Sequence, residues 1–248
     1  MGFVVRLALY VLKGYREWTE SLGEDREWLI QSKQGELHSM TSVEAALAGG
    51  IAIPFRHDVI LVAASGVPGF KLEALKAAIS RVSPVPVELR IGCDETPAGA
   101  LDRGFRGEGC KEGSDALLLA HVDIDDITGF AAEHGLYASY LRIEELRYKL
   151  VDSLSDYGAL VSYLGGDNII VLLPFDRDAL ETLIDVVESE DAKAGIGFSY
   201  SARRAASLAT KCLDSIRRLR GENKVRVCIE GEAPSWLRVY AWETGGLL

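Results

Sequence analysis

The feature that most constrains the fold is an alternation of short apolar segments with longer segments of helical periodicity. In the second half of the chain, residues 116–124 are typical of a strand, and residues 136–156 carry apolar side chains at three- and four-residue steps, as an amphipathic helix does. The segments ALVSYL and IIVLLPF are joined by GGDN, a tight turn in which glycine tolerates a positive φ. A helix over 176–188, a strand over 192–199 and a helix over 202–219 complete the order β-α-β-β-α-β with an extra helix.

The first half of the chain shows the same order. The expected elements are a strand over 4–12, a mostly helical segment over 24–47, a hairpin of IAIPF and VILVAAS around the turn RHDV, a helix over 71–82 and a strand over 85–93. When one half is laid on the other, Asp58 falls opposite Asp167, 109 positions away, and Lys13 opposite Asp123, 110 positions away. Gly92 falls opposite Gly197 at 105 positions, so the halves are predicted to be copies of one unit.

The predicted fold class is therefore α+β, with two tandem palm-like, ferredoxin-like βαββαβ domains that arose by internal duplication. The N-terminal domain is placed at residues 1–107, the C-terminal domain at 114–230 and a tail at 231–248. The charged, glycine-rich segment RGEGCKEGSD (106–115) is the natural linker.

Composition narrows the function classes. A formal charge of −10 argues against a nucleic acid as partner, because binding to its phosphates needs clustered Lys and Arg. No apolar run approaches the roughly 18–20 residues of a membrane span, and Arg6 interrupts the first one, so no signal peptide is predicted. We expect a cytoplasmic protein whose four scattered cysteines (93, 110, 212 and 228) are reduced thiols.

The strongest chemical signal is acidic. HVDIDDIT (121–128) places Asp123 and Asp125 at the end of a buried strand, and Asp167 lies in the GGDN turn. In a palm topology this strand end and this turn converge, so Asp123 and Asp167 would share a cation, with Asp125 on the same face as Asp123. Mg²⁺ favours one or two carboxylates completed by water and substrate phosphates. The alternative is that these residues are helix caps or solvated turn residues, as Asp126 is expected to be.

Other patterns carry less weight. Gly195-Ile-Gly197 lacks the third glycine of a dinucleotide fingerprint, and the four histidines are unclustered, with His121 closest to the acidic residues. Lys211, Arg217, Arg218 and Arg220 form a basic stretch in the last helix. This stretch is expected to be a solvated face, or else Lys211 and Arg217 would partly line a phosphate site.

The motifs AHVDIDDITG, LGGDN, KAGIGFS and ARRAASLA…IR, in this order and spacing, resemble the archaeal GTP cyclohydrolase III family. Weaker landmarks are YREW (15–18), RHD and DETP (94–97), and the resemblance covers most of residues 4–220. It implies a GTP-binding, Mg²⁺-dependent hydrolase that converts GTP to 2-amino-5-formylamino-6-(ribosylamino)pyrimidinone 5′-phosphate and pyrophosphate. It further implies two palm-like domains and is compatible with a homo-oligomer, although the sequence does not fix the oligomeric state.

The resemblance also implies roles for single residues. Asp123 and Asp167 would be the catalytic metal ligands, assisted by Asp125 and the Ile124 carbonyl. Gly165 and Gly166 would let the hairpin approach the phosphates, and Asn168 would bind the substrate.

The N-terminal half departs from the family at Lys13, where an acidic residue is usual, so we expect its own cation site to be lost. Lys13 would contact substrate phosphate, and Asp58 would pair with Lys13 or with a phosphate-bound cation. Two other functions stay open at this point: a nucleotidyl cyclase on the same fold, and a catalytically silent nucleotide-binding protein.

Overall fold

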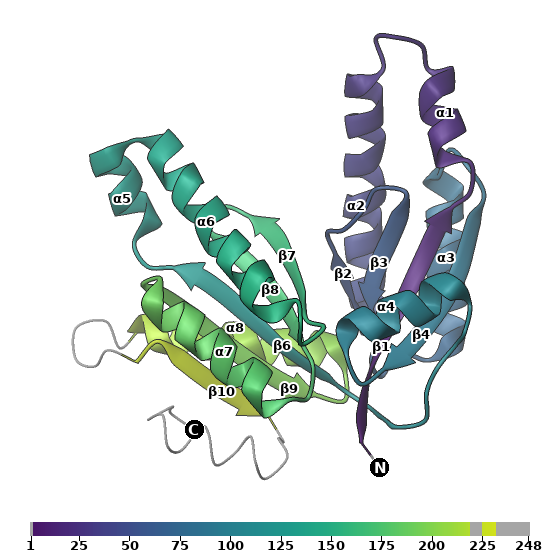
Figure 1. Ribbon diagram of the computed structural model, residues 1–248. Helices are drawn as coiled ribbons and strands as arrows, with labels where there is room; N and C mark the ends of the chain where they lie inside the picture. Colours follow the sequence, from purple (N-terminus) through teal and green to yellow (C-terminus); the bar gives the residue numbers. More distant parts are fainter. Residues whose placement is uncertain (1, 219–224, 232–248) are drawn as a thin grey trace. The chain divides into compact units, whose positions relative to one another are not determined.

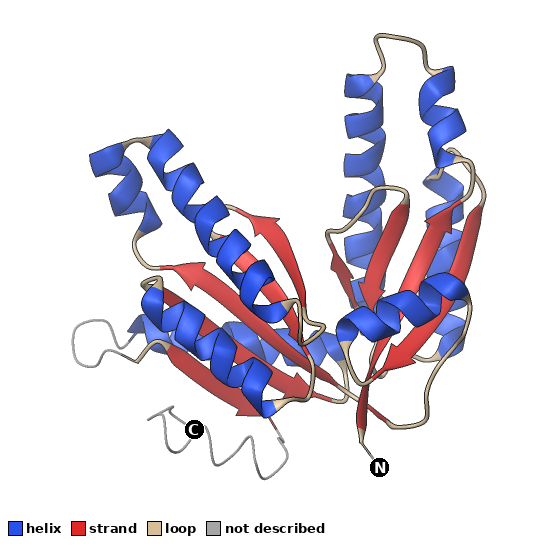
Figure 2. Ribbon diagram, viewed as in Figure 1, coloured by secondary structure: helices blue, strands red, loops and turns tan. Residues whose placement is uncertain are grey.

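The computed structural model describes residues 2–218 and 225–231, which form two five-stranded sheets with helices on both faces of each sheet (Figures 1 and 2). The fold is thus mixed α+β. The chain divides into two compact units, an N-terminal unit of Met1–Glu95, Gly99–Ala116 and Ser201–Arg203, and a C-terminal unit of Thr96–Ala98, Leu117–Tyr200 and the residues from Arg204 onward. The predicted tail lies outside the described residues except for Gly231.

The N-terminal unit is built on a sheet of order β2-β3-β1-β4, in which β1 pairs antiparallel with β3 and β4. A short β5 runs parallel to the start of β1. The elements are β1 (Phe3–Leu12), α1 (Tyr15–Ser21), α2 (Glu27–Ala48), β2 (Ile51–Ile53), β3 (Val59–Ala63), α3 (Gly69–Val82), β4 (Val87–Asp94), α4 (Pro97–Arg106) and β5 (Ser114–Asp115). A core centred on Tyr10, Leu37 and Leu72 fills the space between the sheet, α2 and α3.

The C-terminal unit is built on a sheet of order β10-β9-β6-β8-β7. Strand β6 pairs antiparallel with β8 and β9, and β10 adds a parallel edge strand to β9. The elements are β6 (Leu117–Ile124), α5 (Ile127–His134), α6 (Leu136–Leu154), β7 (Leu160–Gly165), β8 (Asn168–Leu173), α7 (Arg177–Ser189), β9 (Ala192–Ser199), α8 (Ala202–Arg218) and β10 (Val227–Gly231). Helices α6 and α7 cover one face of the sheet and α8 covers the other (Figure 1).

The two units share one order of elements. Each runs strand, short helix, long helix, two strands, helix, strand and helix, and each places its first strand between its third and fourth. The expected strands and long helices are therefore confirmed. The sequence patterns missed α1, α4, α5 and β10, because three of these are short helices and β10 is a five-residue edge strand. Pro97 at the first position of α4 is a helix-start signal that would have found that helix.

Close helix packing explains the glycines of the last strands. A Cβ on Gly197 would lie 1.9 Å from the Ala205 carbonyl oxygen in α8, and one on Gly195 would lie 2.0 Å from that of Ala209. In the N-terminal unit, a Cβ on Gly92 would lie 2.0 Å from the Ala100 carbonyl oxygen in α4. These glycines permit helix and strand backbones to touch, and none of them belongs to a dinucleotide fingerprint.

The expectation of reduced cysteines is wrong, since all four form disulfides, Cys93–Cys110 and Cys212–Cys228. The sequence could not indicate this pairing because the partners are 17 and 16 residues apart and only the fold brings them together. The first bond ties the segment after α4 back to β4, and the second ties α8 to β10.

Removing either bridge is expected to lower the free energy of unfolding by about 3 kcal/mol, because each closes a loop of similar length in the unfolded chain. Chemical denaturation of Cys110→Ser and Cys228→Ser beside the unsubstituted chain, with and without reductant, measures this. The two variants should lose similar amounts, and reductant should bring the unsubstituted chain below both. Insensitivity of the unsubstituted chain to reductant would contradict the bridges.

Candidate active site

Asp123 and Asp167 meet where β6 ends beside the turn between β7 and β8. The register pairs Asp123 with Asn168, so the preceding residue, Asp167, lies in the turn next to the strand end. The two carboxyl groups are close enough for Asp167 to raise the pKa of Asp123. The predicted convergence of these two residues is therefore present in the structure.

The turn that carries Asp167 depends on two glycines. Gly165 has φ 110° and Gly166 has φ 63°, and both values favour a residue without a Cβ. The Tyr163 hydroxyl donates to the Gly166 carbonyl oxygen at 2.8 Å. The positive φ expected of the turn glycines is therefore present, and their role toward phosphates stays a prediction.

Asn168 orients the acidic turn. Its Nδ2 donates to Asp167 Oδ1 at 3.1 Å, and its Oδ1 lies 2.8 Å from His121 Nε2. His121 lies two residues before Asp123 on β6, hence on the same face of the sheet. A chain of hydrogen bonds from His121 through Asn168 therefore holds the Asp167 carboxylate in place.

Asp123 is a buried carboxylate that is only half satisfied. Asp123 is 3% exposed. Arg217 Nη2 lies 2.9 Å from Asp123 Oδ2, whereas Asp123 Oδ1 is buried without any hydrogen-bond partner. Burial, the largest influence, raises the pKa of Asp123; the hydrogen bond from Arg217 lowers it, and neighbouring Asp167 raises it again. An unpartnered anionic oxygen beside a second carboxylate suits a hard cation with oxygen ligands such as Mg²⁺.

Arg217 reaches Asp123 because α8 lies against the sheet. Its Nη1 also lies 3.3 Å from Asp214 Oδ1, one turn earlier in the helix. Gly195 permits the close approach of α8 at Ala209 and Leu213, just before this turn. Arg217 was predicted as a substrate ligand, and the structure places it at the acidic pair.

Asp125 has a different partner. Its Oδ1 lies 2.6 Å from Nζ of Lys193, a lysine with a side chain only 7% exposed. Ile124 is buried in the sheet. Asp126 is an exposed turn residue with φ 52° at the N-cap position of α5 and makes no side-chain capping bond, so it is the expected solvated turn residue and not a side-chain cap. Within residues 2–218 and 225–231, no cluster of three or more His, Cys, Asp or Glu side chains is arranged to hold a metal, so the acidic site is a pair.

The register corrects the comparison between the halves at Lys13. Val11 pairs with Glu88, Asp123 pairs with Lys193, and Glu88 and Lys193 are 105 positions apart, as Gly92 and Gly197 are. The counterpart of Asp123 is therefore Val11, and Lys13 corresponds to Asp125. The error arose because the number of residues that separates equivalent positions of the two units decreases along the chain, from 112 at the first strands to 105 at the last.

This correction reveals a salt bridge with exchanged charges. Lys13 Nζ lies 2.8 Å from Glu88 Oε2, in the positions that Asp125 and Lys193 occupy in the C-terminal unit. Hydrogen bonds from Arg90 and Lys13 lower the pKa of Glu88 to about 2. The expected pairing of Asp58 with Lys13 is wrong, since Arg56 binds both carboxylate oxygens of Asp58, at 3.0 and 2.7 Å.

The two exchanged pairs are expected to differ in strength. Asp125→Ala would leave the buried Lys193 ammonium without its carboxylate and should lower the free energy of unfolding by about 2 kcal/mol, the cost of a buried donor that loses its acceptor. Lys13→Ala removes half of a pair whose side chains are 49% and 42% exposed, so little change should be measurable. Urea unfolding of both variants tests the difference, and equal losses would contradict it.

The remaining basic candidates do not gather at the acidic pair. Lys211 forms an ion pair with Glu230 on β10, whereas Arg217 contacts Asp123. Arg218 is exposed at the end of α8, and Arg220 lies outside the described residues. The predicted pairing of Lys211 with Arg217 at a phosphate site therefore has no geometric support.

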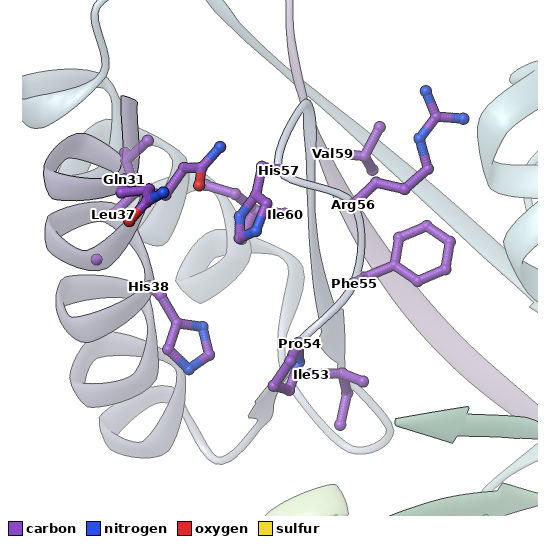
Figure 3. Close-up of a pocket in the computed structure, with 12 residues that line it drawn as sticks. Gln31, Leu37, His38, Ile53, Pro54, Phe55, Arg56, His57, Val59 and Ile60 are labelled. Carbon is purple, nitrogen blue, oxygen red and sulfur yellow. The ribbon is translucent and has the colours of Figure 1, made fainter. Parts of the chain in front are cut away.

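The N-terminal unit contains a pocket of about 300 Å³ between α2 and the β2–β3 hairpin (Figure 3). Leu37, Ile53 and Ile60 contribute apolar surface, and His38 and His57 contribute imidazoles. Arg56 and His57 also line a wider hollow that includes Asp58. Sequence reasoning treated these histidines as isolated, because their shared pocket depends on how the hairpin lies beside the helix.

Two further contributors to the acidic site were missed. Lys193 sits opposite Asp123 on β9 and is buried, and His121 supports Asn168. A lysine within the otherwise apolar strand AKAGIGFS was the available signal for the first. For the second, the signal was the two-residue step from His121 to Asp123.

The fold and the site define a two-sheet α+β protein with paired carboxylates at a β-hairpin. The model of the GTP cyclohydrolase III family matches residues 7–230. GTP cyclohydrolase III of Aeropyrum pernix is 34% identical over 223 residues, 86% of this chain and 92% of that protein. That of Pyrobaculum arsenaticum is 38% identical over 224 residues, 90% of this chain and 97% of that protein. The chain belongs to the GTP cyclohydrolase III family.

Among solved structures, the chain matches the GGEEF domain of a diguanylate cyclase from Vibrio cholerae. It is 17% identical, with a TM-score of 0.39, and the match covers 48% of this chain and 85% of that domain. Among the described residues, no helix is long and apolar enough to cross a membrane.

Proposed function

We propose that this chain is a Mg²⁺-dependent enzyme that hydrolyses GTP to 2-amino-5-formylamino-6-(ribosylamino)pyrimidinone 5′-phosphate with release of pyrophosphate. One water opens the imidazole ring at C8, and a second cleaves the α–β phosphoanhydride. Membership of the GTP cyclohydrolase III family supports the reaction. The buried, unpartnered Oδ1 of Asp123 beside Asp167 is the observation that carries the assignment of the site.

In this proposal the residues of the C-terminal unit have separate roles. Asp123 and Asp167 would hold the cation, with help from the Ile124 carbonyl, and the cation would supply positive charge against the triphosphate. Gly165 and Gly166 let the turn approach the phosphates, while His121 and Asn168 keep Asp167 oriented. Arg217 holds Asp123, and its side chain stays 37% exposed, so it could also contact a phosphate oxygen.

We infer that the N-terminal unit is a duplicated copy without a cation site. The shared strand order, the matched glycines at Gly92 and Gly197 and the exchanged salt bridges support a duplication. Val11 takes the place of Asp123, so Asp58 alone corresponds to the acidic pair. A cytoplasmic location stays part of the proposal, since disulfide-rich intracellular proteins occur in hyperthermophilic archaea.

Product analysis tests the proposed function. GTP is incubated with the purified full-length chain and Mg²⁺, and with the same chain after chelation of divalent cations. The expected result is a ring-opened pyrimidine nucleotide and pyrophosphate, formed only when Mg²⁺ is present. A cyclic or dinucleotide product would favour a nucleotidyl cyclase, and binding without turnover would favour a nucleotide-binding protein. Full activity after chelation would remove the cation from the proposal.

A further inference from the structure

Helix α6 has a second apolar face that no described residue of the C-terminal unit covers. Its inner face buries Ile143, Leu146, Leu150 and Leu154 in the C-terminal unit. On its outer face lie Tyr137, Leu141, Glu144, Tyr148 and Val151, which we call the α6 stripe. The four apolar members are 73%, 48%, 65% and 41% exposed. A helix that keeps large apolar side chains in water along its whole length indicates an interaction surface.

The spacing of the α6 stripe identifies the shape of its occupant. Its members follow one another at steps of four, three, four and three residues, the heptad pattern by which one helix packs along another. Tyr140 flanks the stripe and stacks on Tyr137, with ring centroids 6.3 Å apart. The carboxylate of Glu144 at the centre disfavours insertion into lipid, because the apolar side of a membrane-surface helix excludes charge.

The charges of Glu144 in the α6 stripe and of Arg147 beside it indicate a second copy of the chain as the partner. Arg147 Nη2 lies 2.7 Å from Glu144 Oε2, and both side chains remain partly exposed, at 43% and 31%. A second copy in antiparallel orientation, related by a two-fold axis near Glu144, would bring each Glu144 within reach of the partner's Arg147. The same axis would lay the Tyr137 end of one helix along the Val151 end of the other, so the stripe is complementary to itself in charge and in shape.

We propose that two copies of this chain associate through antiparallel packing of their α6 stripes. The contact would bury the exposed tyrosines, Leu141 and Val151, and form two ion pairs across the axis. This proposal does not depend on the proposed reaction, since no stripe residue belongs to the acidic site.

Sedimentation velocity of the full-length chain over a range of concentrations tests the association. We expect a species of twice the 27.0 kDa chain mass that dissociates on dilution. Leu141→Glu should raise the dissociation constant by roughly a hundredfold or more, because each dimer would bury two uncompensated carboxylates. Phe70→Glu is the matched control, since Phe70 is 73% exposed on α3, and it should leave the dimer unchanged. A monomer at every concentration, or a dimer unaffected by Leu141→Glu, would overturn the proposal.

Charge exchange distinguishes self-association from binding of a different protein. Glu144→Arg and Arg147→Glu should each weaken the dimer, because each places like charges across the axis. An equimolar mixture of the two variants should form a heterodimer, since one chain then offers two arginines and the other two glutamates. The doubly exchanged chain should dimerise again. Failure of both the mixture and the double variant to associate would overturn the antiparallel arrangement, and circular dichroism of each variant confirms that it is folded.

Discussion

Replacing Asp167 by asparagine is expected to lower GTP turnover by on the order of 10³-fold or more, because a bound cation contributes several kcal/mol of stabilisation to a phosphate transition state. Asp123→Asn should have the same effect, since both carboxylates face the same site. Folding should survive, because asparagine keeps the shape of the side chain and removes one of two neighbouring negative charges. Steady-state release of pyrophosphate measures the activity, and the unfolding temperature with and without Mg²⁺ measures whether the cation binds.

Asp58→Asn provides the matched control for this prediction. Asp58 occupies the corresponding turn of the N-terminal unit, but it is bound by Arg56 and has Val11 where the C-terminal unit has Asp123. Its replacement should change turnover much less than that of Asp167. Mg²⁺ should raise the unfolding temperature of the unsubstituted chain and of Asp58→Asn, but not that of the two C-terminal variants. Equal losses at Asp58 and Asp167 would show that both units build a cation site.

The acidic pair was predictable because it depends on topology alone. Any β-α-β-β-α-β unit places the end of its first strand beside the turn of its central hairpin. The pattern of apolar residues gives that topology, and the positions of Asp123 and Asp167 follow from it. The turn glycines were predictable for a local reason, the positive φ at Gly165 and Gly166.

The partners of these residues were not predictable, because they depend on register and on the course of one helix. A shift of two residues along β1 separates the expected counterpart of Asp123, Lys13, from the observed one, Val11. Side chains two residues apart lie on the same face of a strand, so hydrophobic alternation cannot detect such a shift. Likewise, Cys212 meets Cys228 and Arg217 meets Asp123 only because α8 lies along β9, which no local pattern of sequence specifies.

Replacing Gly195 by alanine is expected to separate α8 from β9 and to reduce turnover together with stability. The new methyl group would lie 2.0 Å from the Ala209 carbonyl oxygen and 2.6 Å from the Leu213 amide nitrogen, so the helix backbone must move. Overpacking against backbone costs about 3 kcal/mol. Arg217 lies one turn beyond Leu213, so its contact with Asp123 should loosen as well. Urea unfolding and GTP turnover of the same variant measure both effects.

The comparison with two other glycines isolates the role of α8 at the active site. Gly35→Ala, in the interior of α2 with open space around it, should instead stabilise the chain by about 0.5–1 kcal/mol. Gly92→Ala should destabilise about as much as Gly195→Ala, because its methyl group would meet the α4 backbone at the same distance of 2.0 Å. The counterpart of Gly195 in the N-terminal unit is Arg90. That position does not need a glycine, because α4 ends after 10 residues whereas α8 continues for 17. Gly195 thus serves the additional turns of α8, which carry Arg217. If Gly195→Ala kept full turnover at a temperature where it remains folded, contact of Arg217 with Asp123 would not be needed for the reaction.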